Sequence, residues 1–304
     1  MPHIEPSVSA AGFLVGLIVG LTGMGGGALM TPILVLIFGV APTAAVASDL
    51  VASLFMKPLG ALIHFRRGTV HRPMVKYLLL GSVPSAFAGA ALINHLGSSD
   101  RMNAALRTML GSALLVASVA QLAKAILRSH REGPPGASQI PIAIKPLPTI
   151  AVGVVGGFIV GMTSVGSGSL IIVMLMLLYP RLSGSRLVGT DLAQAIPLVG
   201  TAALGHFLFG HVSLGLTASL IVGSIPGVCL GAYGSARAPD RYIRPVLVLV
   251  LAASALKLLG ASNQLVGGVA AGLGALGVAW ALSESRDETR TPSDDEVAAQ
   301  TAGD

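Results

Sequence analysis

Gly20-Leu21-Thr22-Gly23-Met24-Gly25-Gly26-Gly27 divides the first apolar run of the chain with five glycines in eight residues. A second break, Gly161-Met162-Thr163-Ser164-Val165-Gly166-Ser167-Gly168, lies at the matching place in the second half. Glycine at this density frees the backbone from helical geometry. Within a membrane, such backbone is tolerated only where it is buried in protein or lines a cavity. Paired breaks in two halves of a chain therefore predict the binding site of a transporter.

The composition around the two breaks is that of a polytopic membrane protein. The 304 residues are 53% hydrophobic and 11% charged, with a mean hydropathy of +0.80, whereas a soluble domain carries roughly 25% charged residues. The net charge of +6 does not indicate nucleic acid as a partner, because the basic residues lie in short loops and aromatic residues make up only 4%. No signal-peptide pattern precedes or follows the first apolar run, so we expect it to be retained.

Motifs for cofactor, metal or catalytic chemistry are absent from the sequence. The single cysteine, Cys229, excludes an internal disulfide and a cysteine-based metal cluster. There is no Walker-type phosphate loop, no His-Glu-x-x-His and no Cys/His ligand spacing. We therefore expect no cofactor, no metal site, no catalytic residue and no site for ATP-driven transport within this chain. A secondary transport mechanism follows by elimination.

Eleven apolar segments follow one another along the chain. Segments of about 20 residues or more can cross a bilayer, whereas the four pieces beside the breaks are too short and are predicted to be half-helices. The segments lie at about 7–22, 28–40, 43–66, 73–95 and 102–127, then at 148–163, 169–180, 185–209, 213–235 and 240–259, with a last one at 263–282.

These segments form two repeats. Residues at a spacing of 142 are identical in four prominent pairs: Asp49 and Asp191, His64 and His206, Pro84 and Pro226, and Gly89 and Gly231. The block Ala61-Leu62-x-His64-Phe65-x-x-Gly68-x-Val70 recurs as Ala203-Leu204-x-His206-Phe207-x-x-Gly210-x-Val212. Gly25 and Gly27 pair with Gly166 and Gly168 at a spacing of 141. Order and repetition on this scale indicate a duplication.

Loop charges predict how the repeats lie in the membrane. The loop after 43–66 is basic, and so is the linker after 102–127, so both should be cytoplasmic. In the second repeat the matching loop, 210–213, has no Lys or Arg, and the basic residues come one loop later, at Arg237, Arg241 and Arg244. This alternation fits inverted repeats in which each broken pair enters and leaves on one side. It places the N-terminus outside and the C-terminus in the cytoplasm.

The predicted fold class is an all-α, polytopic membrane bundle of two inverted repeats. Each repeat has a glycine-broken half-helix pair and three transmembrane helices, and one extra C-terminal helix follows. The predicted boundaries are a first repeat at 7–127, a cytoplasmic linker at 128–147, a second repeat at 148–259, the extra transmembrane helix at 260–282 and a disordered polar tail at 283–304.

Several blocks resemble the TauE/SafE family. They are the Gly-x-x-Gly-x-Gly-Gly-Gly opening at 20–27 with Pro32 after it, Ala47-Ser48-Asp49, and Gly60-x-x-x-His64-x-x-x-Gly68. The resemblance extends over about residues 10–260, in both halves. It implies transport of a sulfur-containing anion such as sulfite, sulfoacetate or another organosulfonate, typically out of bacterial cells, and thus a place in the inner membrane. Ser164 and Ser167 depart from the pattern, because the first repeat has glycines there, and they leave the substrate open.

Lys57 lies in the middle of a predicted span. An ionisable group at this depth costs roughly 2.5–3.5 kcal/mol on insertion scales, so it is a functional candidate by default. Lys57 either attracts an anion or forms a structural pair with an aspartate. Its repeat mate is Val199, so the site should be asymmetric. On a helical projection, one sector of about 80° contains Asp49, Ser53, Lys57, Gly60 and His64. This sector should face the protein interior.

The other candidates supply hydrogen-bond donors for an oxyanion. Free backbone N–H groups where the half-helices restart, near Ala28 and Ser169, carry partial positive charge. The structural alternative is close helix packing through small residues, and Gln194 either binds the substrate or bridges helices. The candidate substrate-binding residues are Thr22, Gly23, Gly25, Gly26, Gly27, Lys57, Thr163, Ser164, Gly166, Ser167, Gly168, Ser169 and Gln194.

Four titratable residues are candidates for coupling or gating. Asp49 and Asp191 open their predicted spans, where they stabilise the helix start, hydrogen-bond to the broken helices, or act as a proton relay or gate. His64 and His206 lie beside phenylalanines near span ends. They are interfacial anchors or proton-coupling groups, since histidine titrates near neutral pH.

The expected partners are a small anionic substrate and the lipid bilayer, with proton coupling and an oligomeric state left open. Two other classes of function also remain open. A passive anion channel would share the helix-end site. An intramembrane enzyme would need a nucleophile–base pair at depth, for which Ser53 near Lys57 is the candidate.

Overall fold

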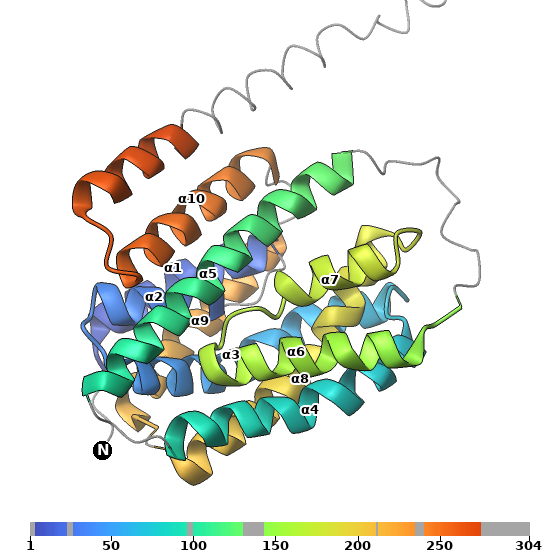
Figure 1. Cartoon of the computed structure of the whole chain (residues 1–304), viewed down its shortest axis with the longest axis horizontal. Coiled ribbons are helices and arrows are strands. Elements are labelled where there is room, and N and C mark those ends of the chain that lie inside the picture. The colour runs from blue at the N-terminus through green and yellow to red at the C-terminus, as the bar shows by residue number, and fades with distance from the viewer. Residues whose placement is uncertain are drawn as a thin grey trace, which may run out of the picture.

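The structure, a computed structural model of the whole chain, is a bundle of helices (Figure 1). It describes residues 4–22, 27–95, 100–129, 143–210, 212–234 and 240–274, which contain helices and no β-strand. A further short helix occupies 263–274. The labelled helices are α1 (Pro6–Thr22), α2 (Gly27–Leu36), α3 (Pro42–Arg66), α4 (Arg72–His95), α5 (Asp100–Ser129), α6 (Pro146–Thr163), α7 (Leu170–Leu178), α8 (Gly184–Phe209), α9 (Leu214–Gly234) and α10 (Asp240–Leu258).

The all-α membrane fold predicted from the sequence is confirmed. Six of the described helices are long and apolar enough to cross a membrane, and they lie in α3, α4, α5, α6, α8 and α9. Of the predicted half-helices, α1, α2 and α7 are shorter than that limit, whereas α6 reaches it with 18 residues. Only 263–274 of the predicted extra helix lies among the described residues, and most of the linker and the whole polar tail lie outside them.

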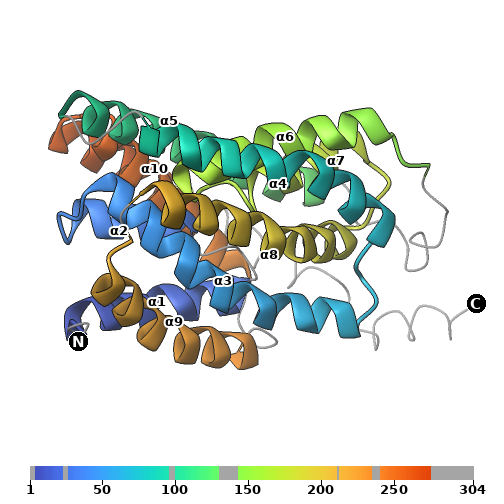
Figure 2. The ribbon, with the colours of Figure 1, turned by 90° about the horizontal axis from the view of Figure 1, so that it is seen from below.

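Helices α1 and α9 run side by side and parallel, although they come from different repeats (Figure 2). Glycines at four-residue spacing on α1 face the backbone of α9, and glycines on α9 face α1. A Cβ would overlap backbone of the partner helix at five of these positions and would press on it at 3.0 Å at Gly12, so the contact exists because both faces lack side chains. The glycines are Gly12, Gly16 and Gly20 on α1 and Gly223, Gly227 and Gly231 on α9.

Helices α4 and α6 pack in the same way, but here the fourth helix belongs to the first repeat and the glycine-bearing first helix belongs to the second repeat. Gly153, Gly157 and Gly161 of α6, each 141 residues after its counterpart in α1, lie against the α4 backbone at Leu78, Ser82 and Ala86. The first helix of each broken pair therefore packs on the fourth helix of the other repeat. Each half thus holds the other half's broken pair in place.

The two broken pairs approach the centre of the bundle from opposite ends (Figure 2). The outer ends of α1 and α2 lie at the end marked by the N-terminus, and those of α6 and α7 lie at the other end. Between them, α3 and α8 contact each other and carry much of the buried core. An inverted repeat requires this arrangement, while its orientation in a membrane remains a prediction.

Hydrogen bonds tie the outer ends of the second broken pair together. The Tyr179 hydroxyl, at the end of α7, accepts from the backbone N–H of Lys145 at 2.9 Å and lies 2.5 Å from Thr149 Oγ1. The residues 141 positions earlier than Thr149 and Tyr179 are Val8 and Phe38, which have no hydroxyl. The hydroxyls that make these hydrogen bonds therefore belong to the second repeat alone.

Candidate functional site

The last residue of the first glycine break meets the second break in the middle of the bundle. Gly27, the first residue of α2, lies so close to Ser164 that a Cβ would overlap the Ser164 carbonyl oxygen. Ser164 ends α6 in the left-handed conformation, with φ of 60°, and Gly166 and Gly168 follow with φ of 123° and 91°. Positive φ at three of five positions turns the chain back on itself, which is why this segment needs small residues.

Lys57 reaches the second break from α3. Its side chain is buried, and its Nζ donates a hydrogen bond to Ser167 Oγ. Asp191 and then Asp49 are the carboxylates that attract the ammonium group. The same ammonium group therefore faces a hydroxyl of the second break, as an anion-binding lysine would, and two buried carboxylates, as a structural ion pair would.

Asp49 also contacts the broken helices. Helix α3 begins at Pro42, so Asp49 lies about two turns inside it, and the expectation that Asp49 opens its helix is wrong. Thr31 Oγ1 of α2 donates to Asp49 Oδ2 at 2.7 Å, and Ser53 Oγ donates to Oδ1 at 3.5 Å. The Ser164 side chain is a further hydrogen-bond partner of this carboxyl. Ser53 therefore hydrogen-bonds to Asp49, whereas the hydroxyl that bonds to Lys57 is that of Ser167.

Asp191 has different neighbours. Helix α8 begins at Gly184, so this aspartate also lies inside its helix rather than at the start. Gln194 Nε2 donates to Asp191 Oδ1 at 3.0 Å, and Gln194 Oε1 accepts from Ser82 Oγ of α4 at 3.1 Å. Gln194 thus bridges α8 and α4 while it orients the acid.

The backbone amides that restart the second broken pair bond within the break. The Gly166 carbonyl oxygen accepts from the N–H groups of Ser169, Leu170 and Ile171 at 3.3, 2.9 and 3.3 Å. Thr163 Oγ1 likewise donates to the Ile159 carbonyl oxygen at 2.6 Å. The Ser169 hydroxyl is different, because it is buried and has no hydrogen-bond partner in the described part of the chain. It is the donor in this break that a ligand would satisfy.

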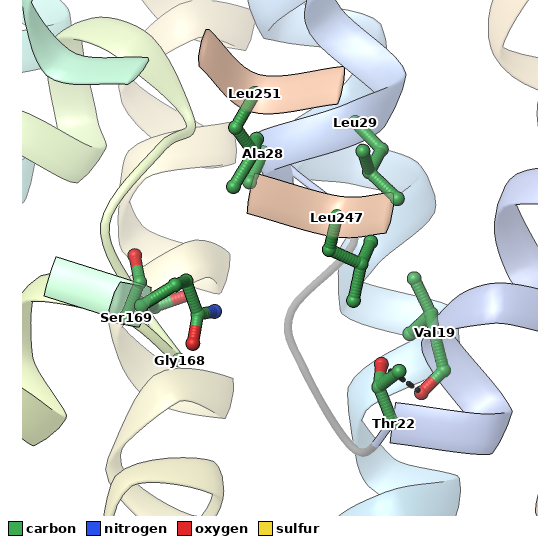
Figure 3. Close-up of a pocket in the computed structure, with 10 residues that line it drawn as sticks. Val19, Thr22, Ala28, Leu29, Gly168, Ser169, Leu247 and Leu251 are labelled. Atoms are coloured by element: carbon green, nitrogen blue, oxygen red, sulfur yellow. Dashed lines mark hydrogen bonds between the residues drawn. The ribbon is translucent and has the colours of Figure 1, made fainter. Parts of the chain in front are cut away.

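A narrow pocket lies where α1, α2 and α10 approach the second break (Figure 3). Polar groups from both repeats line it, among them Thr22, Ser167 and Ser169, and apolar side chains from α2 and α10 complete it. The space open to the centre of a water molecule is about 10 Å³, which is about enough for one water. The lining residues are Val19, Thr22, Ala28, Leu29, Gln121, Ser167, Gly168, Ser169, Leu247 and Leu251.

The two histidines lie apart from the pocket lining and bond to other groups. His64 Nδ1 lies 2.9 Å from Thr69 Oγ1 in the loop after α3. His206 is buried, and its Nε2 lies 2.9 Å from the carbonyl oxygen of Gly161, at the start of the second break. A buried imidazole does not anchor a helix at a membrane interface, so that interpretation is wrong for His206.

Three of the candidate residues, Gly23, Gly25 and Gly26, lie outside the described residues. The structure adds residues that the sequence did not single out: Thr31 bonds Asp49, Ser82 bonds Gln194, and Gln121 lines the pocket. Thr31 is a lone hydroxyl in an apolar half-helix, and this was the only signal that pointed to it.

Residues 8–258 match the family model described as "Sulfite exporter TauE/SafE". The match covers both breaks, Asp49, Asp191 and Lys57. The chain belongs to the TauE/SafE family. Three TauE/SafE-like relatives from Bacillus subtilis (strain 168) are named probable membrane transporter proteins: YjnA, 38% identical over 83% of this chain and 99% of its own; YdhB, 26% over 81% and 97%; and YunE, 25% over 79% and 92%. No solved structure matches the chain.

As a TauE/SafE family protein with six helices able to cross a membrane, the chain is a multi-pass membrane protein. The family and the names of the relatives agree with a transporter rather than an enzyme.

Proposed function

We propose that this TauE/SafE protein is a secondary transporter that exports a small sulfur-containing oxyanion across the bacterial inner membrane. Sulfite, sulfoacetate or another organosulfonate would cross unchanged by alternating access. The observation that carries the proposal is the hydrogen bond from the buried Lys57 ammonium to Ser167 in the second break. It brings a positive charge to the place where unwound backbone meets a pocket.

The chemistry of the pocket favours an oxyanion. Sulfite and sulfonate oxygens only accept hydrogen bonds, so they suit a site built from an ammonium and hydroxyls. Lys57 does not itself line the pocket, but it has three N–H donors and bonds Ser167, which does line it. The Ser169 hydroxyl is buried without a partner among the described residues. A cation would find no carboxylate among the residues that line this pocket.

The size of the pocket supports a carrier over an open channel. Space for about one water is too small for a sulfite ion, which has three oxygens, so a substrate enters only when the helices move. Because each broken pair packs on the opposite half, a displacement of one half against the other would open the pocket toward one side. We infer that the described conformation is closed to both sides.

Charge supports the proposed orientation. The loop after α3 and the start of α8 lie at the same end, because the backbone N–H of His71 donates to Thr190 Oγ1 at 3.1 Å. Residues 66–76 and 179–186 carry Arg66, Arg67, Arg72, Lys76, Arg181 and Arg186 and no acidic residue. We propose that this end is cytoplasmic, which puts the N-terminus outside.

The test is flux into proteoliposomes that contain the purified protein, against sulfite, sulfoacetate, taurine, sulfate and acetate, with and without a pH gradient. We expect saturable flux of one sulfur oxyanion, with acetate excluded. Ohmic anion currents without saturation would favour a channel instead. Transport of acetate alone would reassign the protein to another small organic anion, and absence of flux for all five would remove the anion assignment.

A further inference from the structure

We propose that transport exchanges two equivalent helix contacts, so that α4 separates from α8 at one end of the bundle while α9 closes onto α3 at the other. The inference rests on the proposed function, because it describes how that carrier opens. The contacts are equivalent, since α4 and α9 are the helices that follow α3 and α8 in the two repeats. We call the end at which α4 begins the basic end, after the cationic residues of 66–76 and 179–186.

The two contacts differ in the described conformation. Helix α4 packs along more of α8 than α9 does along α3. The backbone N–H of His71, just before α4, donates to Thr190 Oγ1 of α8 at 3.1 Å. Ser82 Oγ of α4 donates to Gln194 Oε1 of α8, also at 3.1 Å. When inverted repeats differ in this way, an exchange of their conformations turns a carrier to face the other side.

The counterparts of both bonds are missing from the contact of α9 with α3. At a spacing of 142, Thr190 corresponds to Ser48 of α3, and Ser82 corresponds to Ser224 of α9. Both serine hydroxyls are buried, and neither has a hydrogen-bond partner in the described part of the chain. Buried polar groups without partners are costly and rare. The same two positions are therefore bonded in one contact and unbonded in the other.

Ser48 gains a donor once α9 closes onto α3. The residue 142 positions after His71 is Ser213, which directly precedes α9 and is exposed. Its backbone N–H would donate to Ser48 Oγ as the N–H of His71 donates to Thr190 Oγ1. The exchange thus breaks a hydrogen bond at the basic end and forms the equivalent bond at the opposite end.

The exchange is uneven for the second bond. Gln194 has the counterpart Ala52 in α3, so Ser224 cannot repeat the bond that Ser82 makes to Gln194. The contact of α9 with α3 therefore recovers one of the two bonds that the contact of α4 with α8 loses. This difference favours the described conformation when no substrate is bound.

The steric fit differs in the same sense. A Cβ at Gly189 of α8 would lie 2.7 Å from Thr69 Oγ1 and 3.2 Å from His64 Nδ1. The loop after α3 thus rests on α8 at a place that has no side chain. The counterpart of Gly189 is Ala47, whose methyl group stands on α3 where the loop before α9 would close. The contact at the basic end is therefore the more favourable of the two.

The moving helices carry the broken pairs with them. A Cβ at Gly157 of α6 would overlap the Ser82 backbone of α4, and the same holds for Gly16 of α1 against the Ser224 backbone of α9. Helix α6 should therefore move with α4, and α1 with α9. Because α6 leads into the second break while Lys57 lies on α3, separation of α4 from α8 displaces that break relative to the ammonium group. The pocket then opens toward the basic end.

The test is the measurement of distances between spin labels in the full-length protein in lipid nanodiscs, without substrate. In a Cys229→Ser background, labels at Arg72→Cys and Ser185→Cys report the contact of α4 with α8. In a second protein, labels at the counterpart positions, Leu214→Cys and Thr43→Cys, report the contact of α9 with α3. Thr43 is partly exposed and the other three positions are exposed.

Removal of both bonds should shift the equilibrium. Thr190→Val with Ser82→Ala should lengthen the first distance and shorten the second, with the ratio of the two conformations changed about 10- to 100-fold, because each net hydrogen bond accounts for about 3- to 10-fold. Ser48→Ala with Ser224→Ala is the matched control, since these hydroxyls have no partner in the described residues, and it should leave both distances unchanged. Equal effects of the two double variants, no shift in the first, or longer distances at both ends overturn the inference.

Should the first double variant fail to fold, Gly189→Ala tests the same contact. Its added methyl would displace the loop at Thr69, so we expect the same lengthening at the basic end and the same shortening at the other. Gly60→Ala is the control, because its Cβ would meet Leu192 at 3.7 Å. Unchanged distances in Gly189→Ala count against the exchange.

Binding of methanesulfonate links the exchange to the substrate. The pocket of the described conformation is too small for this anion, so a larger population open to the basic end should raise its affinity. Isothermal titration should show tighter binding to Thr190→Val with Ser82→Ala than to Ser48→Ala with Ser224→Ala, and equal affinities overturn this link. Absence of binding in every variant counts against the proposed function alone, because the distance measurements need no substrate.

Discussion

Gly27 of α2 lies directly against the carbonyl oxygen of Ser164, the residue that ends α6. One contact thus joins the restart of the first broken pair to the break of the second. The Lys57–Ser167 hydrogen bond lies in the same break. Small shifts of either broken pair will therefore change the surroundings of the buried ammonium group.

Gly27→Ala should destabilise the protein, because the added methyl would overlap backbone that has little room to move. Overpacking of this kind typically costs about 1–3 kcal/mol, and thermal unfolding in detergent should show it as a lower midpoint. Gly60→Ala is the matched control, since its Cβ would meet Leu192 Cδ1 at an ordinary 3.7 Å. Equal midpoints for the two variants would contradict this packing.

Because the glycine contacts join each repeat to the other, equivalent glycine substitutions in the two repeats should affect folding to a similar degree. Gly16→Val and Gly157→Val should each separate a parallel helix pair, α1 from α9 and α4 from α6, and should reduce the yield of folded protein to a similar degree. Gly267→Val provides the control, because a Cβ there meets nothing within 4 Å. A strong effect in one repeat and none in the other would contradict the reciprocal packing.

Lys57→Ala should abolish anion binding and leave the protein folded in detergent. Ser167→Ala should weaken binding about 10- to 100-fold, because a hydrogen bond to a charged group is worth about 1.5–3 kcal/mol. Binding is measured by isothermal titration with the substrate that the flux panel identifies. Lys257→Ala, at an exposed position, is the control. Normal binding by Lys57→Ala would show that Lys57 is structural.

Cysteine labelling tests the proposed orientation. In a Cys229→Ser background, Ser213→Cys should react with an impermeant maleimide from outside intact cells. Lys145→Cys should react only after the cells are opened. Both positions are exposed. Ser213 precedes α9 and Lys145 precedes α6, and these two helices begin at opposite ends of the bundle (Figure 2). Reaction of Lys145→Cys in intact cells would reverse the orientation.

Acidification should destabilise the start of α4 through His71. Burial lowers the pKa of His71, and the charge of Arg186 lowers it further. The unfolded chain therefore binds more protons than the native state, so the free energy of unfolding falls as the pH drops through about 6.5. His71→Asn, which caps a helix without titrating, should reduce this pH dependence in thermal unfolding, and an unchanged pH dependence would contradict the role of His71.

The sequence was sufficient for the parts of the fold that depend on local pattern. The glycine density, the apolar run lengths and the duplication predicted helices close to those observed and two breaks at equivalent places. The isolation of Lys57 among apolar residues marked it as a candidate, and the structure brings it to the second break.

The cross-repeat contacts were not predictable from those patterns. Helical spacing shows which face of a helix is small, but it does not show which other helix that face meets. The pairing of α1 with α9 was therefore missed, and so was the bond from Thr31 to Asp49. The expectation that Asp49 opens its helix disagreed with the predicted segment itself, because 43–66 already begins six residues before Asp49 and α3 begins at Pro42.

The exchange of partners between repeats sets an order of events during synthesis. Ser9 of α1 bonds the backbone of Ser219 in α9, 210 residues later. At about 5–20 residues per second, the ribosome needs roughly 10–40 s to make the intervening chain. Throughout that delay the first broken pair lies in the membrane without its partner. The first repeat can therefore complete its own structure only after α9 has been inserted.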